Sequence, residues 1–277
     1  AMPHAPITIF LPARNEAAYL APTLASILAQ SLGDFRLVIS NNHSTDHTAE
    51  IIQEYAARDS RIIATAPATP ASAKEHFDFG RTWFDTKYHM FAGAHDLFDK
   101  NYLLRTFEAM ESRPNLIVAG TQCLHFTDDN RQFAIPSINF DSTGLGKLEK
   151  LCIFLQGTYY NHLAYGLYRS ELVRGIKTPT VLGTDHLEMA SLLMKGDCTV
   201  IPEILLYFRY PENVADHKRQ INSLGTADGT QGWRDLMIAL RELIDEHFVG
   251  IEQIYGRQLV KGIKQRIIRQ GMLHNAI

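Results

Sequence analysis

The sequence predicts an α/β fold in which a mixed central sheet is flanked by helices. Two strand–loop–helix units, residues 7–30 and 35–55, open the chain. A third apolar run, residues 88–96, indicates a buried strand that ends on a carboxylate. Strands that alternate with helices are typical of a sheet built from parallel strands with helices on its faces.

The first two units are predicted from residue periodicity. Residues 7–11 form a short, β-rich apolar run of the kind found in buried parallel strands. We expect Pro12 to end this strand, and the apolar spacing over residues 17–30 predicts a helix. The second unit has a strand at 35–40, a polar turn, and a helix that includes Tyr55 and has Ser44, Thr45 or Asp46 as its cap.

The rest of the chain continues the alternation less regularly. We expect further strands at 61–64, 115–120, 165–168 and, as two short strands broken by Pro202, at 199–208. We expect further helices at 103–110, 147–155, 170–174 and 185–195, and two helical segments from 231 to the end that meet near Gly250.

The composition limits the class of protein. The chain has 277 residues, of which 45% are hydrophobic and 21% charged, and its formal net charge is -3. This charge argues against a nucleic-acid partner. No window approaches 18 apolar residues, and no secretory signal is apparent. Cys123, Cys152 and Cys198 are scattered and indicate neither a disulfide framework nor a metal spacing, so a cytoplasmic location fits best.

Polar side chains stand where each of the first three strands ends. In an open α/β sheet this edge is where ligands bind, so we expect a nucleotide site there. The candidates after the first strand, near a helix N-terminus that suits phosphate, are Pro12, Ala13, Arg14, Asn15 and Glu16. A plain strand-to-helix turn is the alternative. Asn41, after the second strand, is the residue we expect to contact the base or ribose.

The third strand end carries His95 and Asp96. A carboxylate is a hard ligand for Mn²⁺ or Mg²⁺, which would neutralise diphosphate oxygens. His95 is expected to contact the ribose or to join the metal. The alternative is that Asp96 only begins a turn. His217 is the second candidate metal ligand, although an exposed loop histidine is the simpler interpretation.

Asp185 stands at the start of a predicted helix. An acid there is well explained by capping and by the helix dipole, and from the residues alone this interpretation is preferred. The functional interpretation is a general base that takes a proton from an acceptor hydroxyl.

The last predicted helix is basic. Its cations are Arg257, Lys261, Lys264, Arg266 and Arg269. A solvated face explains them, and peripheral contact with an anionic membrane surface is the weaker alternative.

Taken in order, these motifs resemble glycosyltransferase family 2, over roughly residues 6–210. The matching segments are Pro12-Ala13-Arg14-Asn15-Glu16, Ser26-Ile27-Leu28-Ala29-Gln30, Asn41-Asn42-His43-Ser44-Thr45-Asp46, Ala94-His95-Asp96 with Tyr102-Leu103, Thr184-Asp185, Gly196, and Ile201-Pro202-Glu203. The chain departs from the family pattern at Asn41, where an Asp is usual, and at Ala94 or His95, where the first acid of the metal motif is usual.

The resemblance implies a Rossmann-like fold of the GT-A type. It would span residues 1–210, with a nucleotide-binding half at about 6–115 and an acceptor half at about 116–210, followed by a C-terminal loop and helical extension at 211–277. It implies an inverting transfer of a sugar from a nucleotide-sugar donor, with a UDP-sugar favoured, to a glycan or lipid-linked acceptor in cell-surface polysaccharide or glycoconjugate synthesis. Asp185 would be the catalytic base and Mn²⁺ or Mg²⁺ the cofactor.

Two other functions stay open at this stage. A nucleotidyltransferase would use a similar sheet, but no Gly-rich loop follows the first strand. A catalytically degenerate domain that binds sugar nucleotides is favoured by Asn41 and His95, whereas Asp185 speaks against it. The sequence leaves the oligomeric state open.

Overall fold

The computed structural model describes residues 5–128, 132–133, 140–157, 161–174, 184–209, 229–249, 256–258 and 261–262. The described strands are β1 Ile7–Ala13, β2 Phe35–Asn41, β3 Ile62–Thr65, β4 Tyr88–Phe91, β5 Leu97–Phe98, β6 Leu116–Phe126, β7 Gln132–Phe133, β8 Leu167–Arg169 and β9 Asp197–Arg209. The described helices are α1 Leu20–Leu28, α2 Thr48–Arg58, α3 Ala73–Arg81, α4 Tyr102–Ser112, α5 Lys147–Gly157, the 3₁₀ helix η1 His162–Tyr165, α6 Ser170–Val173, α7 Thr184–Leu193 and α9 Gly229–His247.

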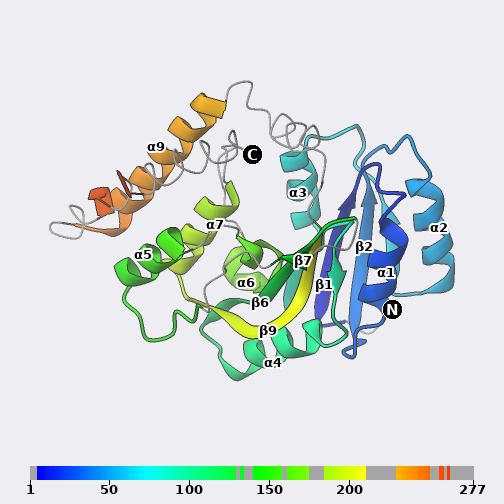
Figure 1. The fold of residues 1–277 in the computed structure, drawn as a ribbon, viewed down its shortest axis with the longest axis horizontal. Helices are drawn as coiled ribbons and strands as arrows, with labels where there is room; N and C mark the ends of the chain where they lie inside the picture. Colours follow the sequence, from blue (N-terminus) through cyan, green and yellow to red (C-terminus); the bar gives the residue numbers. More distant parts are fainter. Residues whose placement is uncertain are drawn as a thin grey trace.

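These strands form one mixed sheet, which confirms the predicted fold class. Their order is β3-β2-β1-β4-β8-β6-β9-β5, and β7 pairs with β6. The four strands from β3 to β4 are parallel, β8 is antiparallel to both of its neighbours, and β6 and β9 are parallel. The helices stand on both sides of the sheet, and the N-terminal and C-terminal halves lie at opposite ends of the molecule (Figure 1).

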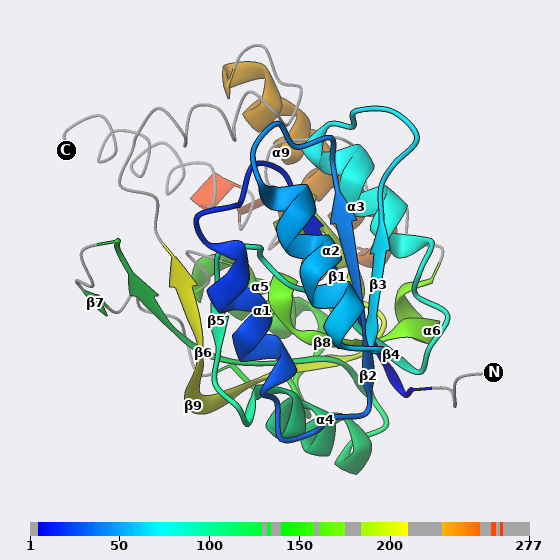
Figure 2. The same ribbon diagram turned by 90° about the vertical axis from the view of Figure 1, so that its right-hand side faces the viewer.

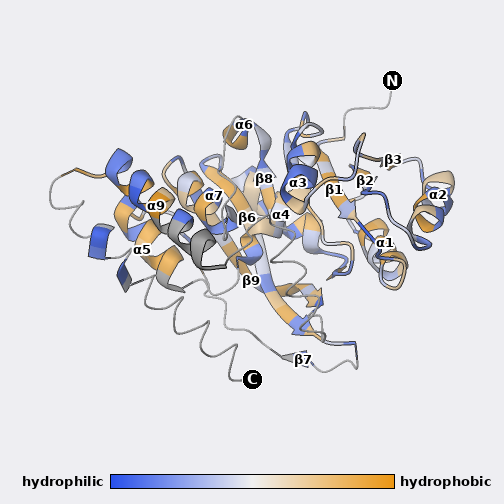
Figure 3. Ribbon diagram, turned by 90° about the horizontal axis from the view of Figure 1, so that it is seen from above, coloured by the Kyte–Doolittle hydropathy of each residue, from blue (hydrophilic) through white to orange (hydrophobic). Residues whose placement is uncertain are grey.

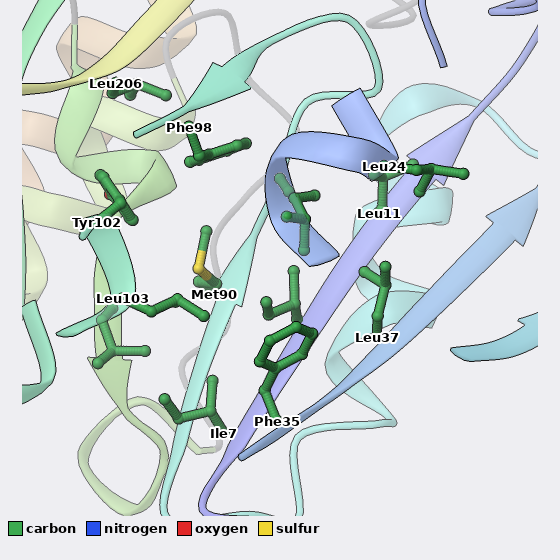
Figure 4. Close-up of a cluster of buried hydrophobic side chains, with 14 of the residues drawn as sticks. Ile7, Leu11, Leu24, Phe35, Leu37, Met90, Phe98, Tyr102, Leu103 and Leu206 are labelled. Carbon is green, nitrogen blue, oxygen red and sulfur yellow. The ribbon is translucent and has the colours of Figure 1, made fainter. Parts of the chain in front are cut away.

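The N-terminal half is held together by the two-residue period of its strands. Ile7, Ile9 and Leu11 of β1 belong to a core shared with α1 and α4, and Figure 4 shows Leu11, Leu24 of α1 and Leu37 close to one another. Phe10 points to the opposite face and packs in an aromatic cluster beside α3. Successive side chains of a strand alternate between faces, so β1 supplies both cores.

The C-terminal half has a separate core behind β6, β8 and β9. It is formed by residues of these strands and of α5, α7 and α9, including Val118, Phe154, Leu187, Leu240 and Phe248. The coloured part of helix α9 carries both hydrophobic and hydrophilic residues (Figure 3). Its Leu240, Leu243 and Ile244, together with Phe248 just after it, pack in the same core as Leu187 and Leu192 of α7. Among the described helices, none is long and apolar enough to cross a membrane.

Pro12 does not end the first strand, contrary to our expectation. Pro12 and Ala13 pair with Ser40 and Asn41 of β2. The Phe10 carbonyl accepts a hydrogen bond from Ala92 on the β4 side, so even-numbered residues of β1 point their backbone groups toward β4. Pairing with β4 stops at Phe10. Pro12, which has no N–H, therefore faces the β4 side at a position where no strand hydrogen bond is formed.

Pro202 does not divide the last strand either. β9 is one continuous strand, and its pairing with β6 jumps from Ile201 opposite Thr121 to Ile204 opposite Gln122. Pro202 and Glu203 occupy this bulge, where a proline removes no ladder hydrogen bond.

Helix α3 was not anticipated from periodicity. Its N-terminus is fixed by a capping box in which the Ser72 hydroxyl accepts from the Glu75 N–H and the Glu75 carboxylate accepts from the Ser72 N–H. The Ser-x-x-Glu spacing is a sequence signal for a helix start. Figure 2 shows α1 and α2 in front of the N-terminal strands, with α3 beyond them near β3.

Candidate functional site

The turn between β1 and α1 is built around Asn15. Its backbone has a φ of 57°, a left-handed conformation that asparagine tolerates better than most residues. Its side-chain oxygen accepts from the backbone N–H of Thr45 at 2.8 Å, while its own N–H donates to the Ser44 hydroxyl at 3.0 Å. Asn15 therefore joins the loops after β1 and β2 into one rim. Pro12, Ala13, Arg14 and Glu16 lie in this same segment.

Two neighbouring asparagines at the end of β2 have different roles. Asn42 is buried, and its amide both donates to the Ala71 carbonyl and accepts from the Ala71 N–H. Asn41 is partly exposed, and its oxygen accepts from the Ser44 N–H at 3.1 Å. Its NH₂ group makes no hydrogen bond within the described chain. Asn41 thus keeps two donors available at the rim, which its aspartate counterpart in the family pattern would lack.

Helix α1 fixes the loop that carries the third strand end. The Ser26 hydroxyl accepts from the Phe98 N–H, and the Gln30 amide donates to the Asp99 carbonyl at 2.7 Å and accepts from the Leu103 N–H. These contacts explain why Ser and Gln occur four residues apart in this helix. They position the chain directly after Asp96.

His95 lies against the first loop. Its Nδ1 is 3.2 Å and 3.3 Å from the two carboxylate oxygens of Glu16. Burial lowers the pKa of His95, but the hydrogen bond to Glu16 and the charge of Asp96 outweigh it and raise the pKa to about 9. The side chain is 26% exposed. His95 is therefore a cation at neutral pH that joins two of the predicted site segments.

Asp96 is fully buried, and its two carboxylate oxygens differ. Oδ1 accepts from the backbone N–H of Arg209 at 3.0 Å, whereas Oδ2 makes no hydrogen bond to a described residue. Oδ2 lies against Gly93, where an added Cβ would come within 2.3 Å of it. Burial raises the pKa of Asp96 to about 6, against the opposing effects of His95 and the Arg209 N–H. A buried acceptor with nothing donating to it suits a cation.

The Arg209 side chain joins several segments beside the strand ends. Its guanidinium stands 4.4 Å from the ring centre of Tyr19 and 4.5 Å from that of Phe126. It donates to the His95 carbonyl at 3.1 Å and to the Asp128 carboxylate at 2.7 Å. These hydrogen bonds connect the end of β9 to the loops that follow β4 and β6.

Asp185 lies at the start of α7, in the acceptor half proposed from the sequence. Its side chain is 47% exposed and stands 3.2 Å from Nδ1 of His186. Surrounding protein raises the pKa of Asp185, but the charge and hydrogen bond of His186 outweigh it, so the pKa is lowered overall. The Asn161 amide donates to the Asp185 backbone carbonyl at 2.9 Å. Asp185 is an accessible, ionised carboxylate with a fixed backbone.

The charges of both Asp96 and Asp185 act on Tyr165. Burial raises the pKa of this phenol, and the next largest effects are the charges of Asp96 and Asp185, in that order. Both carboxylates must be near Tyr165 to act on it, because charge effects weaken with distance. Two of the predicted acids, from segments far apart in the sequence, thus lie within electrostatic range of the same phenol.

A second group of possible ligands was missed in the sequence. Cys123, His125 and His162 are buried, and one ligand atom from each lies within 4.8 Å of the others, so the group could hold a metal ion. Only one of the three cysteines, Cys123, belongs to this group. Cys-x-His within a strand puts both side chains on one face, and this spacing was the available signal.

Two further residues beside the site were not predicted from the sequence. Asn161 and Asp128 gave no local signal because each acts on a residue distant in the chain. His217, the second candidate metal ligand, lies outside the described residues, as do Lys264, Arg266 and Arg269 of the basic segment.

The comparisons with known proteins identify the family to which this fold belongs. Residues 8–175 match the model of Glycosyl transferase family 2. This segment is more than half of the chain, which therefore belongs to glycosyltransferase family 2. An uncharacterized glycosyltransferase from Rickettsia bellii (strain RML369-C) is 24% identical over 209 residues, 70% of this chain. The match covers 30% of that protein, so the chain spans about a third of its relative's length.

Solved structures of S. aureus TarS share the fold. The crystal structure of TarS 1-349 has a TM-score of 0.66 at 13% identity, covering 92% of this chain and 69% of that one. The structure of TarS matches with a TM-score of 0.67 at 14% identity, covering 94% of this chain and 43% of that one. The complex of TarS 1-349 with UDP-GlcNAc has a TM-score of 0.65 at 16% identity, covering 94% and 72%. These likenesses confirm the GT-A type of fold.

Proposed function

We propose that this family 2 glycosyltransferase transfers a sugar from a UDP-sugar to an acceptor hydroxyl with inversion of the anomeric configuration. The observation that supports the proposal is the pair of acids on this fold: Asp96 is a buried strand-end carboxylate whose Oδ2 has no hydrogen bond to a described residue, and Asp185 is exposed at the start of α7. One acid stands at the nucleotide edge of the sheet, and the other stands exposed and ionised on α7. The binding of UDP and UDP-GlcNAc by TarS supports a UDP-sugar donor.

The nucleotide would bind at the rim formed by the first three strand ends. Asn41 would donate its free N–H groups to the base or ribose, and the 12–16 segment would border the diphosphate. Asp96, with its buried Oδ2, fits a Mn²⁺ or Mg²⁺ ion, and His217 is the second proposed ligand. Such an ion would neutralise the charge of the departing diphosphate.

Asp185 would act as the general base. Its carboxylate accepts the proton of the acceptor hydroxyl while that oxygen forms a bond to the anomeric carbon. The bond from this carbon to the diphosphate breaks, and its electron pair leaves with UDP. One base placed opposite the leaving group supports a single displacement and hence inversion. Asn161 holds the backbone of Asp185 and so fixes the direction of the carboxylate.

We propose a glycan or lipid-linked acceptor used in cell-surface polysaccharide or glycoconjugate synthesis, by an enzyme that works in the cytoplasm. The basic C-terminal segment, of which Arg257 and Lys261 are exposed, is the proposed contact with an anionic membrane. Sedimentation with phosphatidylglycerol vesicles tests this contact, and the absence of binding at low salt would contradict it.

The test of the function is Asp185→Asn, assayed by UDP release from UDP-GlcNAc and other UDP-sugars and by calorimetry of UDP binding. We expect turnover to fall roughly 10²–10⁴-fold while UDP affinity is retained, because the amide cannot take the proton. Asp185 also stabilises its helix by about 0.3–1 kcal/mol. Glu149→Gln, which removes an acid from the first turn of α5, is the matched control.

Two outcomes would contradict the proposal. A stable Asp185→Asn protein with full turnover would remove Asp185 from the mechanism. A wild-type protein that binds UDP-GlcNAc but releases no UDP with any acceptor or with water would support the alternative, a domain that binds sugar nucleotides without transferring them.

A further inference from the structure

We propose that Cys123, His125 and His162 form a binding site for Zn²⁺ that is separate from the Asp96 site. Cys123 and His125 lie on β6, and His162 begins η1. The three ligand atoms lie within 4.8 Å of one another. One sulfur and two imidazole nitrogens form a soft to borderline ligand set, which suits Zn²⁺, whereas Mn²⁺ and Mg²⁺ prefer oxygen.

The position of the two strand residues follows from the sheet. Cys123 and His125 are two residues apart on β6, so both side chains point to one face. The pairing of β6 with β9 shifts register between Thr121 and Gln122 and again between Gln122 and Cys123. Such bulges redirect side chains and are frequent beside functional sites. His162 reaches the same place from η1, and its Nε2 is 2.8 Å from Nε2 of His125.

The two imidazole nitrogens require only a small adjustment for a zinc ion. Zinc–nitrogen distances of about 2.0–2.1 Å and a zinc–sulfur distance of about 2.3 Å place tetrahedral ligand atoms about 3.3–3.6 Å apart. The two imidazole nitrogens are closer than this, at 2.8 Å, and must separate by about 0.5 Å. Exchange of one buried imidazole hydrogen bond for two metal bonds favours the bound form.

The burial of the group supports a ligand role over a packing role. His125 is 0%, Cys123 4% and His162 8% exposed. A sheet interior gains more from apolar side chains than from two imidazoles, which have to be desolvated.

A bound zinc ion would fasten η1 to β6. Asn161, next to His162, donates to the Asp185 backbone carbonyl. The site would therefore also steady the proposed base, a consequence that rests on the proposed function, although zinc binding itself does not. Three protein ligands leave one tetrahedral position open, as in non-structural zinc sites.

The test uses the full chain, freed of metal with a chelator and titrated with Co²⁺ as a spectroscopic substitute for Zn²⁺. We expect one equivalent to bind and to produce the near-ultraviolet charge-transfer band of a cobalt–thiolate bond. Zn²⁺ should displace it and raise the melting temperature. Cys123→Ser should abolish the band and weaken Zn²⁺ binding by at least about 100-fold, since second-sphere changes alone cost 10–100-fold.

Three variants make the result decisive. Cys198→Ser removes a buried cysteine of the neighbouring strand and should keep the band. Asp96→Asn should also keep it, which separates this site from the nucleotide site. His162→Gln should lose tight binding even if Cys123→Ser does not fold. A wild-type Co²⁺ complex without a thiolate band, or a band that survives in Cys123→Ser, would overturn the proposal.

Discussion

Substitution of Gly93 by alanine is a direct perturbation of the Asp96 carboxylate. The added Cβ would lie 2.3 Å from Oδ2 and 3.0 Å from Cγ of Asp96, where ordinary contacts begin near 3.4 Å. The carboxylate must therefore move by about 1 Å. It cannot do so freely, because Oδ1 accepts from the Arg209 N–H.

The expected cost has two parts. Overpacking costs typically about 1–3 kcal/mol of unfolding free energy, and we expect Gly93→Ala to lose an amount in this range. A 1 Å displacement of a site group can cost about 10²-fold in function, so Mn²⁺-dependent UDP affinity should fall at least tenfold. Urea denaturation measures the first quantity, and calorimetry with UDP, in Mn²⁺ and in chelator, measures the second.

The control separates stability from binding. Gly80→Ala would place a Cβ 2.6 Å from the Phe10 ring, on the far side of β1. It should destabilise the protein to a similar extent and leave the Mn²⁺ response of UDP binding unchanged. If Gly93→Ala binds UDP with the wild-type Mn²⁺ response, Asp96 does not hold the metal and the account of this site is wrong.

Three further predictions concern other residues. His95→Asp would place a second carboxylate beside Asp96 and should tighten Mn²⁺ binding; unchanged metal and nucleotide affinity would make His95 a bystander. Burial lowers the pKa of His89 to about 3, and the charge of Arg81 is the lesser cause. Between about pH 6.5 and pH 3, His89 is therefore protonated in the unfolded chain and neutral in the folded chain. The free energy of unfolding should fall as the pH drops from 6.5 toward 3, by up to about 1.4 kcal/mol per pH unit for this group. The urea midpoint of His89→Phe should decrease less with falling pH than the urea midpoint of the wild type. Asn161→Ala should lower the turnover number several-fold with little change in UDP affinity; an equal loss in both would indicate a structural role only.

The N-terminal half of the fold could be predicted because its signals are local. Residues 7–11 of β1 and the helices α1 and α2 follow from periodicity, and the family motifs occur at the strand ends where parallel sheets bind ligands. The errors were also local: Pro12 and Pro202 were treated as strand breakers, although each lies where no ladder hydrogen bond is needed.

The missed parts of the site depend on contacts between distant segments. The Cys123, His125 and His162 group forms only when η1 packs on β6. The contact of Asn161 with Asp185 and the hydrogen bond from the Arg209 N–H to Asp96 form for the same reason. Such pairs have no spacing signal in a single sequence. The contacts of the residues near Asp185 can be identified only when the register of the sheet is known.

The central claim, single displacement by one base, is tested most directly by the anomeric configuration of the first product. The protein is mixed with the α-linked UDP-sugar that it binds most tightly and with water as the acceptor, and proton NMR spectra are recorded before the sugar mutarotates. The account predicts that the β-anomer appears first and that Asp185→Asn slows its appearance. An initial α-anomer would mean retention of configuration and would contradict the assignment of Asp185 as the base of an inverting transfer.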